Sequence, residues 1–404
     1  MDTSLDDDKG DDNGDDDIVP PDDDLRLSEP DVGDVEAELL GAVLRRPRLS
    51  SGPMVEHFER RFAAQLGRAH AVAVASGTIG TLLALRAMDL AADDEVIVSP
   101  HGWHQVAHAV TLAGATPVLG EIDYWSGCLD AARAEALVGP RTKAAIVGNV
   151  NGHPAAWAAW RALATRHGFR LVEDATESIG SVYAGRAVGT FGDVSAFDFS
   201  QPSALCCGEG GMVVTDDEAL ARELRYLRAR TLADRRSVSI GARVPMQAGM
   251  SELAAALGAA QLARLPELLA RRKAVEGHYL EQMQSFEGIK PPYVGADVDA
   301  VHWMLWVVHL GKRFTASACD QVVEDLAEEG IEAVRYCVPL HQQFHYQQAR
   351  PDAWRRGRFP LAERIADRAI ALPFHARLTA DHVKFIVKTM KDSSVNVGAG
   401  AAIY

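Results

Sequence analysis

Short apolar runs alternate with helix-forming stretches through the first half of the sequence, and this alternation most constrains the fold. The apolar runs have the length of buried strands and cover residues 71–74, 95–98, 116–119, 144–147 and 171–173. Between several of them lie stretches with helical spacing of apolar residues, such as residues 56–66 and 155–167. Because short buried strands separated by helices form a sheet that is covered on both faces, the pattern predicts an α/β fold with a mostly parallel sheet.

The last third of the sequence has a different pattern, which indicates a second domain. A long helix-prone stretch covers residues 251–283, and strand-like runs follow at residues 301–310 and 331–336. We therefore expect a large domain over residues 27–265 and a smaller C-terminal α/β domain over residues 266–404.

Most of the negative charge of the chain lies in its first residues. The formal net charge of the 404 residues is −15. Residues 1–24 contain twelve aspartates and one lysine, a net −11, which leaves −4 for the rest. Such a polar segment cannot bury apolar surface, so we expect residues 1–26 to form a disordered acidic tail. The tail is either a solvating segment or a docking site for a basic partner.

The composition also argues against several partners and locations. The sequence has no basic cluster suited to nucleic acid. It has no uninterrupted apolar run of the roughly 20 residues that a membrane helix needs, and it does not begin with the pattern of a signal peptide. We expect a cytoplasmic protein that acts on a small-molecule substrate. We expect this protein to bind neither nucleic acid nor a membrane.

Three segments place chemically useful groups at the ends of expected strands. The Ser-Gly-Thr tripeptide at residues 76–78 leads from a strand into a helix, where small residues let backbone amides approach a phosphate. The second segment, VEDATESIG at residues 172–180, places Asp174 at a strand end and is followed by GTFGD at residues 189–193. The third is FDFSQPSALCCGEGG at residues 197–211.

These segments closely resemble those of the DegT/StrS-type sugar aminotransferase family, namely EDAAQ, GTFGD and FSF…PTK…GEGG. The similarity runs from about Leu27 to Lys391, nearly the whole folded chain. The resemblance implies the fold type I of enzymes that depend on pyridoxal phosphate (PLP), with a seven-stranded sheet. It also implies a homodimer with the active site at the interface.

The resemblance further implies a cofactor site. Asp174 matches the aspartate that pairs with the pyridine nitrogen and keeps the ring protonated, so that the ring accepts electrons from a substrate carbanion. Ser76, Gly77 and Thr78 match the segment that approaches the cofactor phosphate. Trp103 matches the aromatic residue that stacks on the pyridine ring.

The sequence departs from the family where the cofactor is held. Ser203 stands in place of the lysine that binds PLP covalently, and a hydroxyl cannot form an imine. Asp198 replaces a phosphate-binding serine, and a carboxylate about 4 Å from a phosphate dianion costs several kcal/mol at an effective dielectric constant near 20. Gly249 replaces the arginine of an N-x-R element. We therefore expect no cofactor, with non-covalent pyridoxamine phosphate (PMP) or PLP as the alternative.

A cavity without a cofactor places several acidic groups together. We expect Asp174, Glu177 and Asp198 to open on it, and three carboxylates in one pocket raise the pKa of at least one of them. These three residues and His104 are candidate general acids or bases. Ser203 is a candidate nucleophile or a substrate hydrogen-bonding group, and Asp174 is alternatively a silent remnant.

Three histidines have helical spacing beside Trp103. His101, His104 and His108 fall at i, i+3 and i+7, which places them on one helix face. The face is a surface or core face, or it carries a single catalytic histidine. A metal site completed by Asp198 or Glu177 is the least favoured alternative, and we expect no metal.

Gln201, Tyr336 and His341 are candidate substrate contacts, since the last two match a family segment at the mouth of the site.

Three functions remain open at this point. The first is an enzyme without PLP that dehydrates, cyclises, isomerises or condenses a specialised metabolite or sugar-derived substrate. The second is a dehydratase-like enzyme or aminotransferase variant with non-covalent PMP. The third is a non-catalytic partner of an active paralogue.

Overall fold

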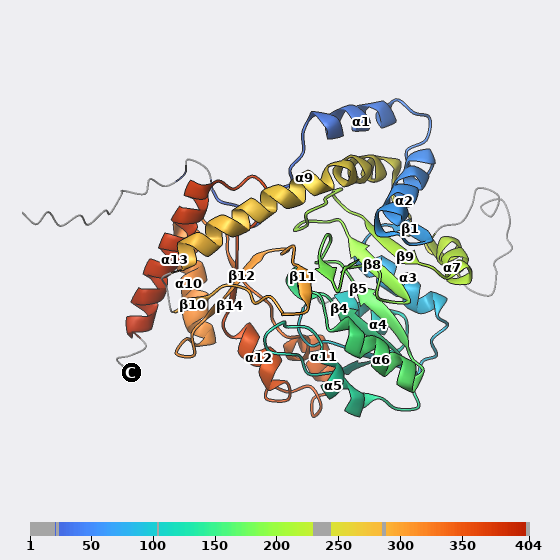
Figure 1. The fold of residues 1–404 in the computed structure, drawn as a ribbon. Coiled ribbons are helices and arrows are strands. Elements are labelled where there is room, and N and C mark those ends of the chain that lie inside the picture. The colour runs from blue at the N-terminus through green and yellow to red at the C-terminus, as the bar shows by residue number, and fades with distance from the viewer. Residues whose placement is uncertain (1–20, 22–23, 103–104, 229–243, 285–287, 401–404) are drawn as a thin grey trace, which may run out of the picture.

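A computed structural model describes residues 21, 24–102, 105–228, 244–284 and 288–400. Its centre is a seven-stranded sheet in the order β1-β9-β8-β5-β4-β2-β3 (Figure 1). The strands are β1 (His70–Val74), β2 (Glu95–Val98), β3 (Thr116–Leu119), β4 (Thr142–Gly148), β5 (Arg170–Asp174), β8 (Val194–Asp198) and β9 (Gly211–Thr215). Neighbouring strands from β3 to β8 are parallel, whereas β9 is antiparallel to β8 and β1. The predicted α/β fold with a mostly parallel seven-stranded sheet is confirmed.

Helices cover both faces of this sheet (Figure 1). The helices of this part of the chain are α1 (Asp34–Leu44), α2 (Pro53–Leu66), α3 (Gly77–Ala87), α4 (Gln105–Leu112), α5 (Ala131–Ala134), α6 (Trp157–His167) and α7 (Glu218–Arg228). Alternate residues of β1 point to opposite faces. Ala71 and Ala73 belong to the cluster that includes α2, whereas Val72 and Val74 pack in the cluster that includes α3. Both faces are therefore buried, which explains the continuous apolar runs in the sequence.

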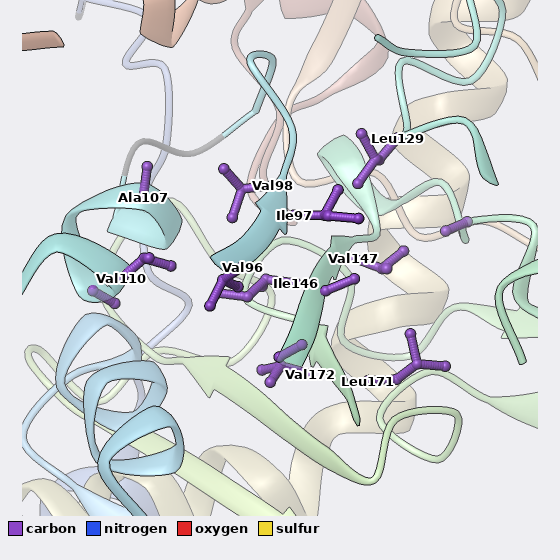
Figure 2. Packing of buried hydrophobic residues seen from close by; sticks show 14 of the residues in the cluster. Val96, Ile97, Val98, Ala107, Val110, Leu129, Ile146, Val147, Leu171 and Val172 are labelled. Atoms are coloured by element: carbon purple, nitrogen blue, oxygen red, sulfur yellow. The ribbon is translucent and has the colours of Figure 1, made fainter. Parts of the chain in front are cut away.

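The central strands are packed against helices through buried apolar side chains. Figure 2 shows Val96 and Val98 of β2 near Ala107 and Val110 of α4. All four side chains are buried. The strands around the site are thus held by apolar contacts over much of their length, and several polar groups lie at their carboxyl ends.

A second, four-stranded antiparallel sheet lies in the C-terminal part, in the order β10-β12-β14-β13. Its strands are β10 (Ile289–Lys290), β12 (Trp306–Leu310), β13 (Val334–Arg335) and β14 (Ala369–Leu372), and its helices are α10 (Ala316–Glu328), η3 (Leu340–Gln342), α11 (Phe344–Ala349), α12 (Pro360–Ala366) and α13 (Ala380–Gly400). A small third sheet joins β6 (Val182–Tyr183), β7 (Arg186–Ala187) and β11 (Val298–Ala300), which connects the two parts of the chain.

Helix α9 (Glu252–Met283) runs from one part of the chain to the other (Figure 1). It contacts α1 and α2 near one end and α13 near the other. The expected boundary between residues 265 and 266 falls inside this helix, and the division into two domains stays a prediction. By length and composition α9 also matches a membrane span. This match is weak evidence because many of its side chains, including Arg272, are buried against the rest of the protein.

Two boundaries in the structure differ from those expected from the sequence, namely the start of the folded chain and the start of β12. Leu25, expected in the tail, is buried and forms a bridge with Ile331, so the folded chain begins earlier than residue 27. Most of the expected tail lies outside the described residues. The strand expected at residues 301–310 begins only at Trp306, because the Asn151 side chain binds the backbone N–H and C=O of Leu305.

Candidate functional site

The site lies where the carboxyl ends of β4, β5 and β8 meet at one edge of the sheet. Asp174 is the last residue of β5, and its side chain is only 6% exposed. One oxygen accepts hydrogen bonds from the Thr176 N–H at 3.0 Å and from the Thr176 hydroxyl at 2.6 Å. Burial raises the pKa of Asp174, the Thr176 hydrogen bonds lower it, and the nearby charge of Asp198 raises it again. The structure thus places one predicted carboxylate in a desolvated position.

Glu177 is the second buried carboxyl group of the site. Its Oε2 accepts hydrogen bonds from the Asn151 N–H and, at 2.9 Å, from the Tyr336 hydroxyl. Its Oε1 is buried and has no hydrogen-bond partner among the described residues. Burial raises the pKa of Glu177 to about 7, and the charge of Asp174 adds to this effect. Asp174 and Glu177 line one cavity, so this expected pairing is present.

Asp198, the last residue of β8, does not point into that cavity but binds the start of α3. Its Oδ2 accepts a hydrogen bond from the Gly77 N–H at 2.6 Å. Its Oδ1 accepts hydrogen bonds from the Ser200 N–H at 2.8 Å and from the Ser200 hydroxyl. Ser76 caps the same helix, because its hydroxyl accepts a hydrogen bond from the Ile79 N–H. Thr78 follows in the first turn of α3.

Ser203 lies in the loop between β8 and β9, at the same edge of the sheet. It is half-buried, and its hydroxyl accepts a hydrogen bond from the Leu205 N–H at 3.3 Å. The sequence contains no lysine between Lys143 and Lys273. Lys143 lies near the opposite end of β4, and Lys273 is paired with Glu276. Neither of these two lysines takes the place of the missing amine.

Several predicted site residues lie elsewhere. Gln201 is exposed, and its amide donates a weak hydrogen bond to the Ser28 carbonyl at 3.4 Å. His341 is fully buried and hydrogen-bonded to Glu363 at 2.9 Å, which is a contact within the C-terminal part. Trp103 and His104 lie outside the described residues. Tyr336 does reach the site through its contact with Glu177.

The expected histidine face does not form as one helix face. His101 precedes α4, and its ring is buried and hydrogen-bonded to the Gly127 carbonyl. Burial lowers the pKa of His101 to about 4, so the ring is neutral near pH 7. His108 stacks on Tyr346. Within the described ranges, no group of three His, Cys, Asp or Glu side chains is placed to hold a metal ion.

The strand-end aspartate, the Ser-Gly-Thr turn into α3 and the loop after β8 all lie in the part of the chain that matches a known family. The model of the DegT/DnrJ/EryC1/StrS aminotransferase family matches residues 30–391. The chain belongs to this family. The match covers the whole seven-stranded sheet and the C-terminal sheet, so the family expected from the sequence is confirmed.

Two relatives and one solved structure illustrate the similarity of this family member to known proteins. The spore coat polysaccharide biosynthesis protein SpsC of Bacillus subtilis is 32% identical over 378 residues, which are 91% of this chain and 96% of SpsC. The dTDP-3-amino-3,4,6-trideoxy-alpha-D-glucose transaminase of Streptomyces venezuelae is 34% identical, covering 87% and 90% of the two chains. The putative sugar aminotransferase Spr1654 of Streptococcus pneumoniae has the same fold, with a TM-score of 0.86 at 23% identity and coverage of 93% and 98%.

The expectation that this aminotransferase-family chain has no cofactor is wrong. The family is one of aminotransferases, and a solved structure of DesV from S. venezuelae, 31% identical to this chain with a TM-score of 0.82 and coverage of 92% and 99%, is a complex with a ketimine intermediate. These findings point to a vitamin B6 cofactor. Asp174 fits the ring end of such a cofactor, because its buried carboxyl group stands at the end of β5 beside a cavity. At the start of α3 the fit is poorer, because Asp198 binds the Gly77 amide.

Asn151, which lies shortly after β4, was not among the predicted site residues, yet it positions two groups at this family member's site. Asn151 has a left-handed backbone with φ of 51°, and its N–H holds Glu177 while its side chain holds Leu305. No local motif marks it. The only available signal was its place just after a strand that neighbours β5, since polar groups at that edge converge.

Replacing Glu177 with glutamine is expected to remove a pH dependence of stability. The pKa of Glu177 is near the usual glutamate value of 4.5 in the unfolded chain and about 7 in the folded protein. The folded state therefore binds the extra proton, and the stability contributed by Glu177 falls as pH rises from 4.5 to about 7. The free energy of unfolding of Glu177→Gln, minus that of the unmodified protein, should rise by about 3 kcal/mol across this window.

The prediction is tested as a difference in unfolding free energy between two proteins, because buried histidines change stability with pH in the opposite direction. Burial lowers the pKa values of His101, His302 and His309 to about 4, so these groups make the folded state less stable as pH falls. Urea unfolding of both proteins at several pH values cancels their effect. Glu281→Gln, on the exposed side of α9, is the matched control and should give a flat difference. A flat difference for Glu177→Gln as well would contradict the assignment.

Proposed function

We propose that the protein is a vitamin B6-dependent enzyme that acts on a sugar-type substrate and holds its cofactor without a covalent bond. One observation carries the proposal: the loop after β8 offers a serine, Ser203, where a covalent link needs an amine, while the buried Asp174 remains at the end of β5. PMP already carries its own amino group and so suits a site without a lysine. The name of the Streptomyces transaminase supports a nucleotide-linked sugar as the substrate class.

The cofactor, when bound, supplies a protonated ring that accepts electrons from the substrate. The role of Asp174 is to keep a proton on the ring nitrogen, since its buried carboxyl group stands at the ring end of the site. The Thr176 hydrogen bonds hold that carboxyl group in one orientation. This anchoring is independent of any bond to a lysine.

In the absence of a lysine amine, another group must move protons in the site. Glu177 is our candidate, because its pKa of about 7 lets it hold or release a proton near neutral pH. Its free Oε1 is buried at the cavity, and Tyr336 and Asn151 fix its Oε2. These groups serve either a dehydration or an amine transfer. A homodimer that shares the site at its interface is part of the proposal.

Cofactor binding tests this function. We expect the protein to bind PMP in the micromolar range, measured by calorimetry and by the absorbance of the cofactor. Asp174→Ala should weaken binding at least tenfold, because a charge-assisted hydrogen bond contributes about 1.5–3 kcal/mol. Asp352→Ala, an exposed aspartate between α11 and α12, is the control and should bind as the unmodified protein does. Equal affinity in Asp174→Ala, or no binding of PMP and PLP at millimolar concentration, would overturn the proposal.

A further inference from the structure

Asp198 occupies the position at the start of α3 that best receives an anion. The first amides of a helix have no partner within the helix and carry partial positive charge, so they attract anions. In α3, which is eleven residues long, the Gly77 N–H is the first of these amides. It donates its hydrogen bond to Asp198 at 2.6 Å. The helix start is thus bound to a carboxylate of the chain itself.

The contact leaves little room for a second anion on the Gly77 amide. A Cβ atom placed on Gly77 would lie 2.8 Å from the Asp198 Cβ and 2.9 Å from its Oδ2. On the other side, a Cβ on Gly211 would lie 2.6 Å from the Gly77 nitrogen. The end of β8, the start of β9 and the start of α3 therefore pack closely around this amide.

The second oxygen of Asp198 is also held, so the carboxylate does not turn away freely. The Ser200 N–H and hydroxyl both bind Oδ1. All of these donors are neutral groups. An arriving phosphate dianion meets an existing negative charge within contact distance, and in a partly buried site this repulsion is weakly screened.

We propose that Asp198 takes the place of the cofactor phosphate at the first turn of α3 and so sets which vitamin B6 compound the site prefers. This inference rests on the proposed function. Asp198 weakens the binding of compounds with a phosphate group and leaves the binding of pyridoxamine, which carries a neutral hydroxymethyl group there, unchanged. A helix start with a free amide would favour PMP over pyridoxamine. In this protein, that preference for PMP is reduced or lost.

The test compares the unmodified protein with Asp198→Ser and Asp198→Asn in calorimetric titrations. PMP should bind Asp198→Ser at least tenfold more tightly than the unmodified protein, whereas pyridoxamine should bind both within about twofold. Asp198→Asn keeps the shape of the side chain and should behave in the same direction, which covers the case that the serine variant folds poorly. Asp352→Ser is the matched control and should change neither affinity. Equal PMP affinity in the unmodified protein and both Asp198 variants would overturn the inference.

Inorganic phosphate separates this inference from the proposed function. Titrated at constant ionic strength, phosphate should bind Asp198→Ser in a saturable manner and should not bind the unmodified protein. If no vitamin B6 compound binds any form while phosphate binds only the Asp198 variants, the proposed function falls and the role of Asp198 stands. If phosphate binds the unmodified protein as tightly as Asp198→Ser, the role of Asp198 falls whatever the vitamin B6 compounds do.

Discussion

Ser203→Lys is expected to turn a reversible cofactor complex into a covalent one. The introduced amine lies in the loop after β8, next to the strand that ends in Asp174, and an amine condenses with the aldehyde of PLP where a hydroxyl does not. After incubation with PLP and reduction with borohydride, the intact mass of Ser203→Lys should increase by one reduced cofactor. The unmodified protein should gain no stoichiometric label, because it has no lysine between residues 144 and 272 to react at the site.

A lysine elsewhere in the same loop controls for non-specific labelling. Gln201 is exposed and directed toward Ser28, so Gln201→Lys should not gain the stoichiometric label. Peptide mapping of Ser203→Lys should place the label at position 203. Labelling of both variants to the same extent, or of neither, would contradict the position assigned to Ser203.

Glu173→Ala is expected to cause the largest loss of stability. Glu173 is fully buried, and its carboxylate accepts hydrogen bonds from several groups that position the strand ends around the site. The donors are the N–H groups of Gly189, Phe191 and Gly192, the Ser195 hydroxyl and the Asn149 side chain. Each buried donor left without a partner costs about 1–3 kcal/mol, so we expect a loss of about 5 kcal/mol or more. Since whole proteins have about 5–15 kcal/mol of stability, the variant should be close to unfolding.

Two further variants separate the hydrogen bonds from the general effect of a truncation. Glu173→Gln keeps the shape of the side chain and one of its two acceptor oxygens, so it should lose less stability than Glu173→Ala. It should still lose some stability, because the other oxygen becomes a donor that faces other donors. Glu281→Ala removes an exposed carboxylate on α9 and should stay within about 0.5 kcal/mol of the unmodified protein. Urea unfolding measures all three. A loss below 1 kcal/mol for Glu173→Ala would contradict this account of the strand ends.

The sequence predicts strands β1 to β5 of the central sheet well because their apolar runs are short and largely buried, whereas β8 and β9 were not among the expected runs. The apolar runs at residues 95–98 and 116–119 coincide with β2 and β3. The C-terminal strands were harder to delimit. Residues 301–305 have the apolar character of a strand. They are not part of β12, because the side chain of Asn151, distant in the sequence, binds the backbone of Leu305.

The site was only partly predictable, for the same reason. Asp174 ends β5 and Glu177 lies three residues after it, so their proximity follows from local sequence. The orientation of the Asp198 side chain does not follow from local sequence, because it depends on a hydrogen bond from the Gly77 amide, 121 residues away in the sequence. His341 looked like a site residue by its segment, yet its partner is Glu363. Long-range hydrogen bonds decide these orientations, and a sequence pattern does not contain them.

The wrong expectation about the cofactor has a chemical origin. The expectation rested on Ser203, which stands where the resemblance implies a lysine. A missing lysine would remove a covalent link, but it would not remove the other groups proposed to bind the ring. Asp174 remains buried at the end of β5, and the α3 helix start remains in place. Covalent attachment and binding are separate properties, and only the first follows directly from Ser203.

The most direct test of the central claim is a pair of mass spectra of the protein after incubation with PMP or PLP and desalting. The native spectrum should show the added mass of one cofactor per chain, and it also reports whether the chain is a dimer. The denaturing spectrum, recorded after borohydride treatment, should show the mass of the polypeptide alone. A native spectrum without cofactor at saturating concentration, or a denaturing spectrum that retains it, would contradict the claim that this site holds vitamin B6 without a covalent bond.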